Sequence, residues 1–327
     1  MTVGMILGKF LPPHAGHLYL AEFARRFADE LIIVVGTLAN EPIPGELRFQ
    51  WMRELVPSAR VVHLTDENPQ DPSEHPAFWD IWRESLLRVL PRRPDLVFAS
   101  ETYGARLARE LGATFVPVDP ARSAIPVRAT DVRRDLRAGW AHLPPPVRAH
   151  FTKRICIFGP ESTGKTTLAE GLAAHYQTAW VPEYARTLLE HRDGEVEAGD
   201  MLTIARGQLA AEDALARTAG PVLFCDTDAL ATTIWSRALF GACDPTLDAL
   251  ATSRRYDLHL LLDVDVPFVE DPVRYLPERR AEFFALCEHA LRTSGRRYVT
   301  LSGAWDDRFT NAVAAIDALL AEPTDLA

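Results

Sequence analysis

Apolar residues fall in short, largely uninterrupted runs along this chain, separated by longer stretches in which they recur at the spacing of an α-helix. Such runs predict strands that are buried on both faces, as in a parallel sheet. They lie at 2–7, 31–35, 97–101 and 115–122 in the first half, and at 154–158, 221–225 and 258–263 in the second. Helical spacing through about residue 27 and over 167–174 predicts a helix after the first strand of each half. This order predicts an α/β fold with a parallel sheet in each half.

The chain is long enough for two domains of ordinary size. It has 327 residues, and the strand that opens the second half begins at 154. Between the halves, the segment 141–148 contains three consecutive prolines and breaks all periodicity. Because prolines favour an extended conformation, we expect a stiff connector there. We therefore predict one domain over 1–150 and a second over 151–327.

Composition and charge narrow the class of protein. Apolar residues make up 47% of the chain and charged residues 24%, as in globular proteins, and the net charge of −10 comes with no polybasic block. We therefore expect no nucleic-acid partner. Lys9 directly follows the short apolar run at the start, which is not typical of a signal peptide. No apolar run is long enough to span a membrane. We expect a cytoplasmic protein with no membrane partner, and the sequence leaves open whether it forms a homo-oligomer.

A phosphate-binding motif lies at the start of the second half. Residues 159–166 read Gly-Pro-Glu-Ser-Thr-Gly-Lys-Thr and fit the P-loop pattern G-x-x-x-x-G-K-[ST], between a predicted strand and a predicted helix. The glycines let backbone N–H groups converge on an anion, and the helix adds its positive dipole end. We expect Lys165 to contact the β- and γ-phosphates of ATP and the Thr166 hydroxyl to bind Mg²⁺. The predicted nucleotide-binding residues here are Gly159, Ser162, Gly164, Lys165, Thr166 and Thr167.

Acidic and basic residues later in the second half suit the same chemistry. Asp226, Thr227 and Asp228 follow the predicted strand at 221–225. An acidic residue at the end of a buried strand commonly helps to hold Mg²⁺ beside a P-loop, so we predict Asp226 as a metal ligand. The segment 270–280 carries several arginines. We predict that it closes as a lid, with Arg274 neutralising the transferring phosphoryl group; a charged, solvated helix start is the alternative.

The first half has a histidine-containing turn after its first strand. His14 and His17 lie three residues apart around a glycine, at the start of a predicted helix. Imidazole N–H groups in this position can bind phosphate oxygens, and Lys9 adds a fixed positive charge. Attack of one phosphate on another needs mainly positioning and neutralised charge, so no general base is required. The alternative is a metal site, but the turn lacks a nearby third carboxylate or cysteine ligand.

These residues resemble the nucleotidylyltransferase superfamily, whose signature is an H-x-G-H turn after the first strand. Residues 8–10 and 13–17 are similar to the nicotinamide mononucleotide (NMN) adenylyltransferase branch, and Arg48 with Trp51 resembles its R-x-x-W helix. The resemblance implies that Gly8, Lys9 and Phe10 bind nucleotide. It also implies that Trp79 and Trp82 form the nicotinamide site, where an aromatic face stacks on the pyridinium. Core packing is the alternative for one of these two tryptophans.

The second signature of that superfamily, S-x-T-x-x-R, is only partly present. In residues 128–133, Thr130 and Arg133 match it and are therefore implied to bind the ATP phosphates. Arg128 stands where the signature has serine. A serine there would cap the helix and donate to phosphate, whereas arginine supplies charge without a cap. This departure concerns the catalytic efficiency of the first domain and not its fold.

The second half resembles the ribosylnicotinamide kinase domain of NadR-type bifunctional proteins. The resemblance implies substrate contacts from Glu183, Tyr184 and Asp228, and an adenine-pocket contact from Arg308. Either Glu183 or Asp228 then binds or deprotonates the riboside hydroxyl. The lid differs from the family's W-V-D-D-G-L-R, since residues 268–274 read Phe-Val-Glu-Asp-Pro-Val-Arg. Some members begin with a helix-turn-helix module, for which the expected first strand at residue 2 or 3 leaves no room in this sequence.

Together these resemblances imply a bifunctional enzyme of NAD salvage that uses ATP and Mg²⁺. The second domain would phosphorylate nicotinamide riboside to NMN, and the first would adenylylate NMN to NAD with release of pyrophosphate. Catalytic roles fall to His14, His17, Lys165, Glu183 and Asp226. Two alternatives stay open: a first domain that only senses nucleotides, or the same chemistry on another nucleoside or phosphorylated acceptor.

Overall fold

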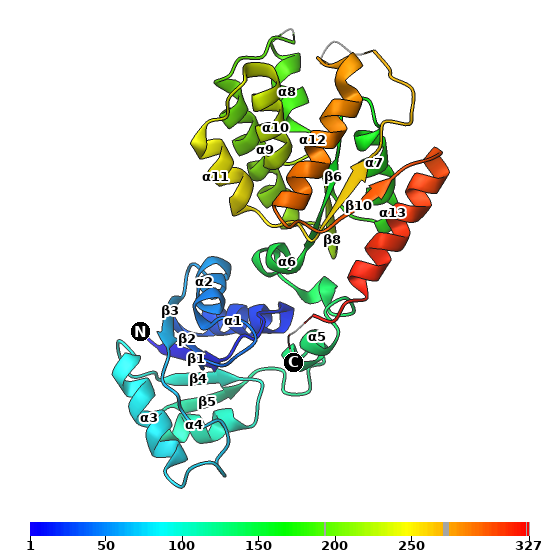
Figure 1. Ribbon diagram of the computed structural model, residues 1–327. Coiled ribbons are helices and arrows are strands. Elements are labelled where there is room, and N and C mark those ends of the chain that lie inside the picture. The colour runs from blue at the N-terminus through cyan, green and yellow to red at the C-terminus, as the bar shows by residue number, and fades with distance from the viewer. Residues whose placement is uncertain (193, 271–274, 325, 327) are drawn as a thin grey trace. The chain divides into compact units, whose positions relative to one another are not determined.

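The chain forms two compact units in the computed structural model, which describes residues 1–192, 194–270, 275–324 and 326. Unit 1 comprises Met1–Val147 with Thr324 and Leu326, and unit 2 comprises Arg148–Pro323. Each unit contains a five-stranded parallel sheet with helices packed against it (Figure 1). The predicted fold class, two successive α/β units with parallel sheets, is therefore confirmed. Within the described part of the chain, no helix is both long and apolar enough to cross a bilayer.

The sheet of unit 1 has the strand order β3-β2-β1-β4-β5, so its first strand is central. Val3 pairs with Glu30 of β2, and Gly4 pairs with Leu96 of β4. The elements are β1 (Val3–Gly8), α1 (Ala15–Phe27), β2 (Glu30–Gly36), α2 (Gly45–Leu55), β3 (Arg60–Leu64), α3 (Phe78–Val89), β4 (Leu96–Ala99), α4 (Tyr103–Leu111), β5 (Thr114–Pro117), α5 (Ala129–Arg134) and the 3₁₀ turn η1 (Trp140–His142).

Both faces of this sheet are covered by helices. Ile6 of β1 packs with residues of α1 and α2, whereas its neighbour Met5 packs with residues of α3 and α4. Successive strand residues point to opposite faces, so both must be apolar when both faces are covered. This explains why the strands of unit 1 read as uninterrupted apolar runs. Because the histidine turn directly follows β1, it lies at the carboxyl edge of the sheet, where ligands bind in such folds.

The sheet of unit 2 has the order β10-β9-β6-β8-β7, again with its first strand central. α7 and α13 share a core on one face, and α10 and α12 share another core. The elements are α6 (Pro145–Phe151), which spans the division between the units, and then β6 (Lys153–Phe158), α7 (Lys165–Tyr176), β7 (Trp180–Val181), α8 (Tyr184–Glu190), α9 (Asp200–Ala216), β8 (Val222–Asp226), α10 (Ala229–Phe240), α11 (Pro245–Ser253), β9 (Leu258–Leu262), the 3₁₀ turn η2 (Pro277–Arg279), α12 (Arg280–Thr293), β10 (Tyr298–Leu301) and α13 (Trp305–Leu320).

The consecutive prolines between the halves begin a helix, so the predicted extended connector is wrong. Pro145 is the first residue of α6, and Pro146 is the second. In the first turn of a helix the backbone N–H has no partner within the helix, and proline already has the required φ. Prolines that would break a helix interior are therefore accommodated at its start.

Candidate active sites

The histidine turn of unit 1 is built as the N-terminal cap of α1. Nδ1 of His14 accepts a hydrogen bond from the backbone N–H of Gly16 at 3.1 Å, and Nδ1 of His17 accepts one from the N–H of His14 at 3.3 Å. The two rings stack with centroids 3.8 Å apart. Because both Nδ1 atoms act as acceptors, each neutral ring carries its hydrogen on Nε2. The capping bonds thus leave two Nε2–H donors for a ligand.

Both histidines are held in the neutral form. Burial, with Arg122 and His142 adding to the effect, lowers the pKa of His14 to about 4. Burial, followed by the neighbouring His14 and Arg122, lowers the pKa of His17 well below its usual value. At neutral pH the histidines are therefore hydrogen-bond donors without charge. Permanent positive charge in this site comes from lysine and arginine side chains.

A cavity of about 700 Å³ opens beside the turn, at the carboxyl ends of the strands. Its lining includes polar, aromatic and backbone groups suited to a nucleotide, among them Gly8, Lys9, Phe10, His14, His17, Trp79, Trp82, Arg122, Arg128 and Thr130. Eight of these are residues predicted from the sequence, and the structure brings them together around one cavity. The ninth predicted residue, Arg133, donates from Nη1 to the carbonyl of Leu11 at 2.7 Å and so supports the turn.

A buried arginine fixes the chain just before the histidine turn. The side chain of Arg48 on α2 is 0% exposed and donates to the carbonyl oxygens of Lys9 at 2.6 Å and of Ile43 at 3.1 Å. It also forms an ion pair with Glu41, whose other oxygen lies 3.0 Å from Nζ of Lys9. A buried guanidinium must satisfy its donors, and here it does so by holding the loop that carries Lys9.

Arg122 is a cavity residue that the sequence analysis did not single out. β5 ends at Pro117, so the predicted strand over 115–122 is too long. The carboxylate of Asp119 accepts from the N–H groups of Ser123 and Ala124 at 2.8 and 3.0 Å, which closes a turn around Arg122. The side chain of Arg122 pairs with Glu101 and lines the cavity. Its signal in the sequence is a turn-forming aspartate directly after a strand, at the same edge as the histidines.

Arg128 occupies the N-cap position of α5 with an extended backbone, but its side chain makes no capping bond. The side chain is exposed and lines the cavity, as does that of Thr130. The guanidinium is therefore available to an anion in the cavity. The structure is compatible with a phosphate contact in place of the missing serine cap.

The P-loop of unit 2 runs from the end of β6 to the start of α7, and two of its glycines are required by shape. Gly159 has φ 135°, and a Cβ there would lie 2.9 Å from the carbonyl oxygen of Leu262. Gly164 has φ 87°, and a Cβ there would lie 2.2 Å from the ring of Trp305. Only glycine tolerates both conditions. Nζ of Lys165 donates to the carbonyl of Pro160 at 2.8 Å, inside the curve of the loop.

Thr166 and Asp226 form a site suited to a divalent cation. The Thr166 hydroxyl donates to Oδ2 of Asp226 at 2.6 Å, whereas Oδ1 of Asp226 is buried with no hydrogen-bond partner among the described residues. Burial, followed by the nearby Glu183 carboxylate, raises the pKa of Asp226 to about 6. Mg²⁺ prefers carboxylate and hydroxyl oxygens, and a cation would satisfy the unpartnered atom. These residues therefore fit the predicted metal.

A second cavity, of about 180 Å³, lies beside the P-loop. The predicted residues Ser162, Gly164, Lys165, Thr166, Thr167 and Glu183 line it. Further lining residues include Glu161, Arg186, Gln208, Trp235, Leu239 and Tyr275. The cavity thus joins phosphate-binding groups to an apolar and aromatic wall. Sequence analysis missed that wall, because its aromatic residues come from α10 and from the segment before η2.

Two residues predicted to bind substrate point elsewhere. Asp228 is 0% exposed, caps α10 by accepting from the N–H of Ala231 at 2.8 Å, and accepts from Nη1 of Arg296 at 2.7 Å. Burial opposes its ionisation, but a hydrogen bond from His259 and the charge of Arg296 hold its pKa below the usual value. The ring of Tyr184 packs against Gly207, where a Cβ would lie 2.2 Å from it. Of the two candidates left open, Glu183 lines the second cavity and Asp228 does not.

Of the two arginines predicted to bind nucleotide in unit 2, Arg308 is buried. Arg308 is 1% exposed, and its guanidinium donates to the carbonyls of Thr163 at 3.2 Å and Gly303 at 3.0 Å and pairs with Asp265. It therefore supports the P-loop from behind and does not face the cavity. Trp305, 51% exposed, covers this guanidinium at 5.5 Å. Arg274 lies outside the described residues.

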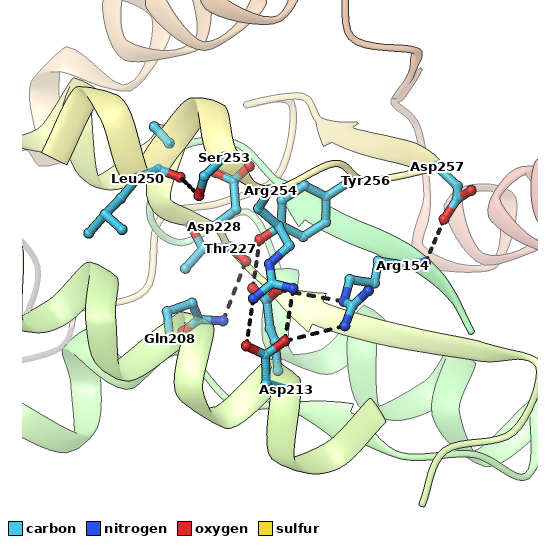
Figure 2. Close-up of polar contacts among 12 residues, drawn as sticks. Arg154, Gln208, Asp213, Thr227, Asp228, Leu250, Ser253, Arg254, Tyr256 and Asp257 are labelled. Carbon is cyan, nitrogen blue, oxygen red and sulfur yellow. Dashed lines mark hydrogen bonds and ion pairs between the residues drawn. The ribbon is translucent and has the colours of Figure 1, made fainter. Parts of the chain in front are cut away.

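Gln208 of α9 connects the two sides of the second cavity. Its Oε1 accepts from the backbone N–H of Tyr184 at 3.0 Å, next to Glu183. Its Nε2 donates to the carbonyls of Asp226 at 3.3 Å and Thr227 at 3.5 Å; the latter bond is drawn in Figure 2. A single buried amide thus sets the distance between the start of α8 and the end of β8.

Two parallel α/β units, each with a turn suited to phosphate after its central strand, define a transferase acting on nucleotides, and comparison with known proteins narrows the class. A family model described as an AAA domain matches residues 154–308. The chain is 28% identical over 346 aligned residues to the trifunctional NAD biosynthesis/regulator protein NadR of Escherichia coli (strain K12), covering 98% of this chain and 84% of that protein. It is 30% identical over 161 residues to the nicotinamide-nucleotide adenylyltransferase of Thermococcus kodakarensis, covering 46% of this chain and 82% of that enzyme.

The solved structures agree with the fold. A crystal structure of NadR in complex with NR matches 100% of this chain and 98% of its own with a TM-score of 0.78, at 24% identity. The chain therefore belongs to the nicotinamide-nucleotide adenylyltransferase family, and along its length it is homologous to NadR. The predicted resemblance to NadR-type proteins is confirmed.

Proposed function

We propose that this protein is a bifunctional enzyme of NAD salvage, which phosphorylates nicotinamide riboside to NMN with ATP and adenylylates NMN to NAD. The observation that carries this proposal is that one chain contains two phosphate-binding turns. This chain is homologous to NadR over 98% of its length. Each turn follows the central strand of its own sheet. NadR crystal structures of the same fold were solved with NR and with NAD and AMP-PNP. We assign one reaction to each unit.

Unit 1 is the proposed adenylyltransferase. An oxygen of the NMN phosphate attacks the α-phosphorus of ATP, the bond to the β-phosphate breaks, and pyrophosphate leaves. Negative charge builds on the phosphate oxygens during this displacement. The Nε2–H donors of His14 and His17 and the fixed charges of Lys9, Arg122 and Arg128 are placed to stabilise it. No side chain has to accept a proton, because the attacking phosphate oxygen is already ionised.

The nicotinamide ring of NMN needs a separate part of the same cavity. Trp79 and Trp82 of α3 line the cavity and are only partly buried. A cationic pyridinium is attracted to the face of an indole ring. Nε1 of Trp82 donates to the carbonyl of Pro69 at 2.8 Å, which fixes the orientation of its ring. We assign both tryptophans to this subsite.

Unit 2 is the proposed kinase. Lys165 and the N–H groups of the P-loop hold the β- and γ-phosphates of ATP, and Thr166 and Asp226 would hold Mg²⁺, which would neutralise phosphate charge there. The 5′-hydroxyl of the riboside attacks the γ-phosphorus, and ADP leaves. Glu183 lines the cavity and binds this hydroxyl or accepts its proton. Exposed Trp305, lying against Gly164, is the better candidate for contact with the adenine base than Arg308 beneath it.

The acceptor of the kinase fits the aromatic wall of the second cavity. Trp235 and Tyr275 line it together with apolar residues of α9 and α10. A flat, positively charged nicotinamide ring suits such a wall better than a polar sugar alone would.

Product analysis tests the proposal directly. Purified protein with nicotinamide riboside, ATP and Mg²⁺ is expected to form NMN and then NAD, and NMN with ATP alone is expected to give NAD and pyrophosphate. NMN that accumulates without NAD would favour a unit 1 that only senses nucleotides. Absence of NMN, with phosphorylation of another nucleoside, would favour a different acceptor.

A further inference from the structure

The third residue of the P-loop motif, Glu161, makes contacts that phosphate binding does not explain. Its side chain is 8% exposed, and each carboxylate oxygen accepts a backbone hydrogen bond: Oε2 from Tyr275 at 2.9 Å and Oε1 from Leu276 at 2.8 Å. Both donors are far away in the sequence. The carboxylate is thus bound at both oxygens by two consecutive residues of another segment.

A carboxylate at this place works against the main task of the loop. The P-loop gathers donors around a triphosphate, and a negative charge a few residues away repels that ligand. Both oxygens of Glu161 are occupied by the N–H groups of Tyr275 and Leu276, which reduces this repulsion but does not remove it. A compensating role for the carboxylate must therefore lie at Tyr275.

Tyr275 belongs to the acceptor side of the cavity and is fixed at two points. Its backbone is held by Glu161, and its hydroxyl donates to the carbonyl of Gly194 at 2.6 Å, in the segment after α8. The side chain between these points lines the cavity with Trp235. The ring therefore has little freedom to leave the cavity while both contacts persist.

We propose that Glu161 is a positioning residue for the acceptor: it holds the Tyr275 ring in place to receive the base of the nucleoside. This inference rests on the proposed kinase function and adds an acceptor role to the loop that we assign to phosphate binding. Ser162, the next residue, reinforces the connection, because its hydroxyl accepts from the N–H of Val269 at 2.8 Å. The loop that binds ATP thereby also supports a wall of the acceptor subsite.

The test measures steady-state kinase kinetics on the full chain. In Glu161→Ala we expect the KM for nicotinamide riboside to rise about tenfold or more, because two hydrogen bonds to a charged group are lost. The KM for ATP should change less than about twofold. Glu161→Gln keeps one acceptor oxygen, so its effect should be intermediate. Glu170→Gln, an exposed charge change on α7, is the matched control and should alter neither constant.

A double-mutant cycle separates positioning from a general weakening of the loop. In a Tyr275→Ala background, Glu161→Ala should raise the riboside KM little further, because the ring that it positions is gone. An equal rise in both backgrounds, or a parallel rise in the KM for ATP, would overturn the inference. If Glu161→Ala does not fold, the same criteria apply to Glu161→Gln. A wild-type protein that does not phosphorylate the riboside would instead overturn the proposed function and this inference with it.

Discussion

The hydroxyl of Thr166 donates to the carboxylate of Asp226 at 2.6 Å, joining the first turn of α7 to the end of β8. These two residues come from neighbouring strand–helix connections around β6, since β6 pairs directly with β8. Among the described residues Oδ1 of Asp226 has no hydrogen-bond partner, and a cation bound at this pair would satisfy it.

Replacing Lys165 with alanine should abolish phosphorylation of nicotinamide riboside and leave adenylylation of NMN intact. The lysine belongs to the P-loop of unit 2, whereas the histidine turn belongs to unit 1. Separate assays of NMN and NAD formation check this. A parallel loss of both activities in a folded variant would contradict the assignment of one reaction to each unit.

Replacing His17 with alanine should slow NAD formation from NMN by roughly 10²–10³-fold, the usual cost of one transition-state donor. The change also removes the acceptor that caps the N–H of His14, so stability would fall as well. His17→Asn is the matched variant, because its amide oxygen can keep the cap while the Nε2–H donor is lost. Equal slowing in both variants, with kinase activity unchanged, would confirm the donor role; a normal rate in the asparagine variant would make the histidine structural.

Replacing Arg128 with serine should weaken ATP binding in the adenylylation assay by about tenfold. The exposed guanidinium lines the cavity and makes no cap, so its loss removes a charge-assisted contact worth roughly 1.5–3 kcal/mol. The serine restores a helix cap worth about 1 kcal/mol, which should raise the melting temperature of the protein slightly. A KM for ATP that stays level or improves would show that Arg128 makes no phosphate contact.

The buried, neutral side chain of His14 should make unit 1 less stable in mild acid. The pKa of His14 is about 4 in the folded protein, below the 6.5 of an ordinary exposed histidine, so the unfolded chain binds more protons between these values. Stability should therefore fall as pH drops from about 6.5 to about 4, by up to about 3 kcal/mol. Urea unfolding of the wild type and of His14→Asn at pH 7 and pH 5 measures this. The asparagine variant should lose less stability on acidification; an equal loss in both would assign the effect to other groups.

Replacing Gln208 with leucine should lower the kcat of the kinase by about tenfold without changing adenylylation. The amide holds the start of α8, with Glu183, against the end of β8, with Asp226, through bonds each worth about 1 kcal/mol. Loss of this connection changes the spacing of the two carboxylates, while the P-loop keeps its own contacts. A reduced riboside phosphorylation rate at saturating ATP checks this; an unchanged kcat would show that α8 is held by other contacts.

The sequence was informative wherever one local rule decides the structure. Strands buried on both faces must be apolar throughout, so the runs at β1, β2, β6, β8 and β9 were predicted nearly to their ends. The P-loop and the histidine turn are also local, because their residues are neighbours in the chain. No such rule decides the structure of the prolines at the start of α6, since the same residues suit an extended segment or a helix start.

The remaining parts of the sites depend on contacts between distant segments. Asp226 and Asp228 are nearly adjacent, yet Thr227 between them has φ 70°, and the second carboxylate turns into the core toward Arg296. No pattern in the sequence distinguishes these two carboxylates. Glu161 and Tyr275 likewise meet only in the fold. Such residues become visible only when the hydrogen bonds of each buried polar group are followed.

The first strand is central in both sheets, but its first partner strand is synthesised at a different stage in each unit. Val3 of β1 finds its partner at Glu30, in the very next strand, whereas Lys153 of β6 pairs with Val222 and not with β7. During synthesis the strand that carries the P-loop therefore waits, unpaired and apolar, until α7, α8, α9 and β8 have been made. Contacts distant in sequence slow folding, so unit 1 should complete its sheet early and unit 2 should be the slower, more chaperone-dependent part of the chain.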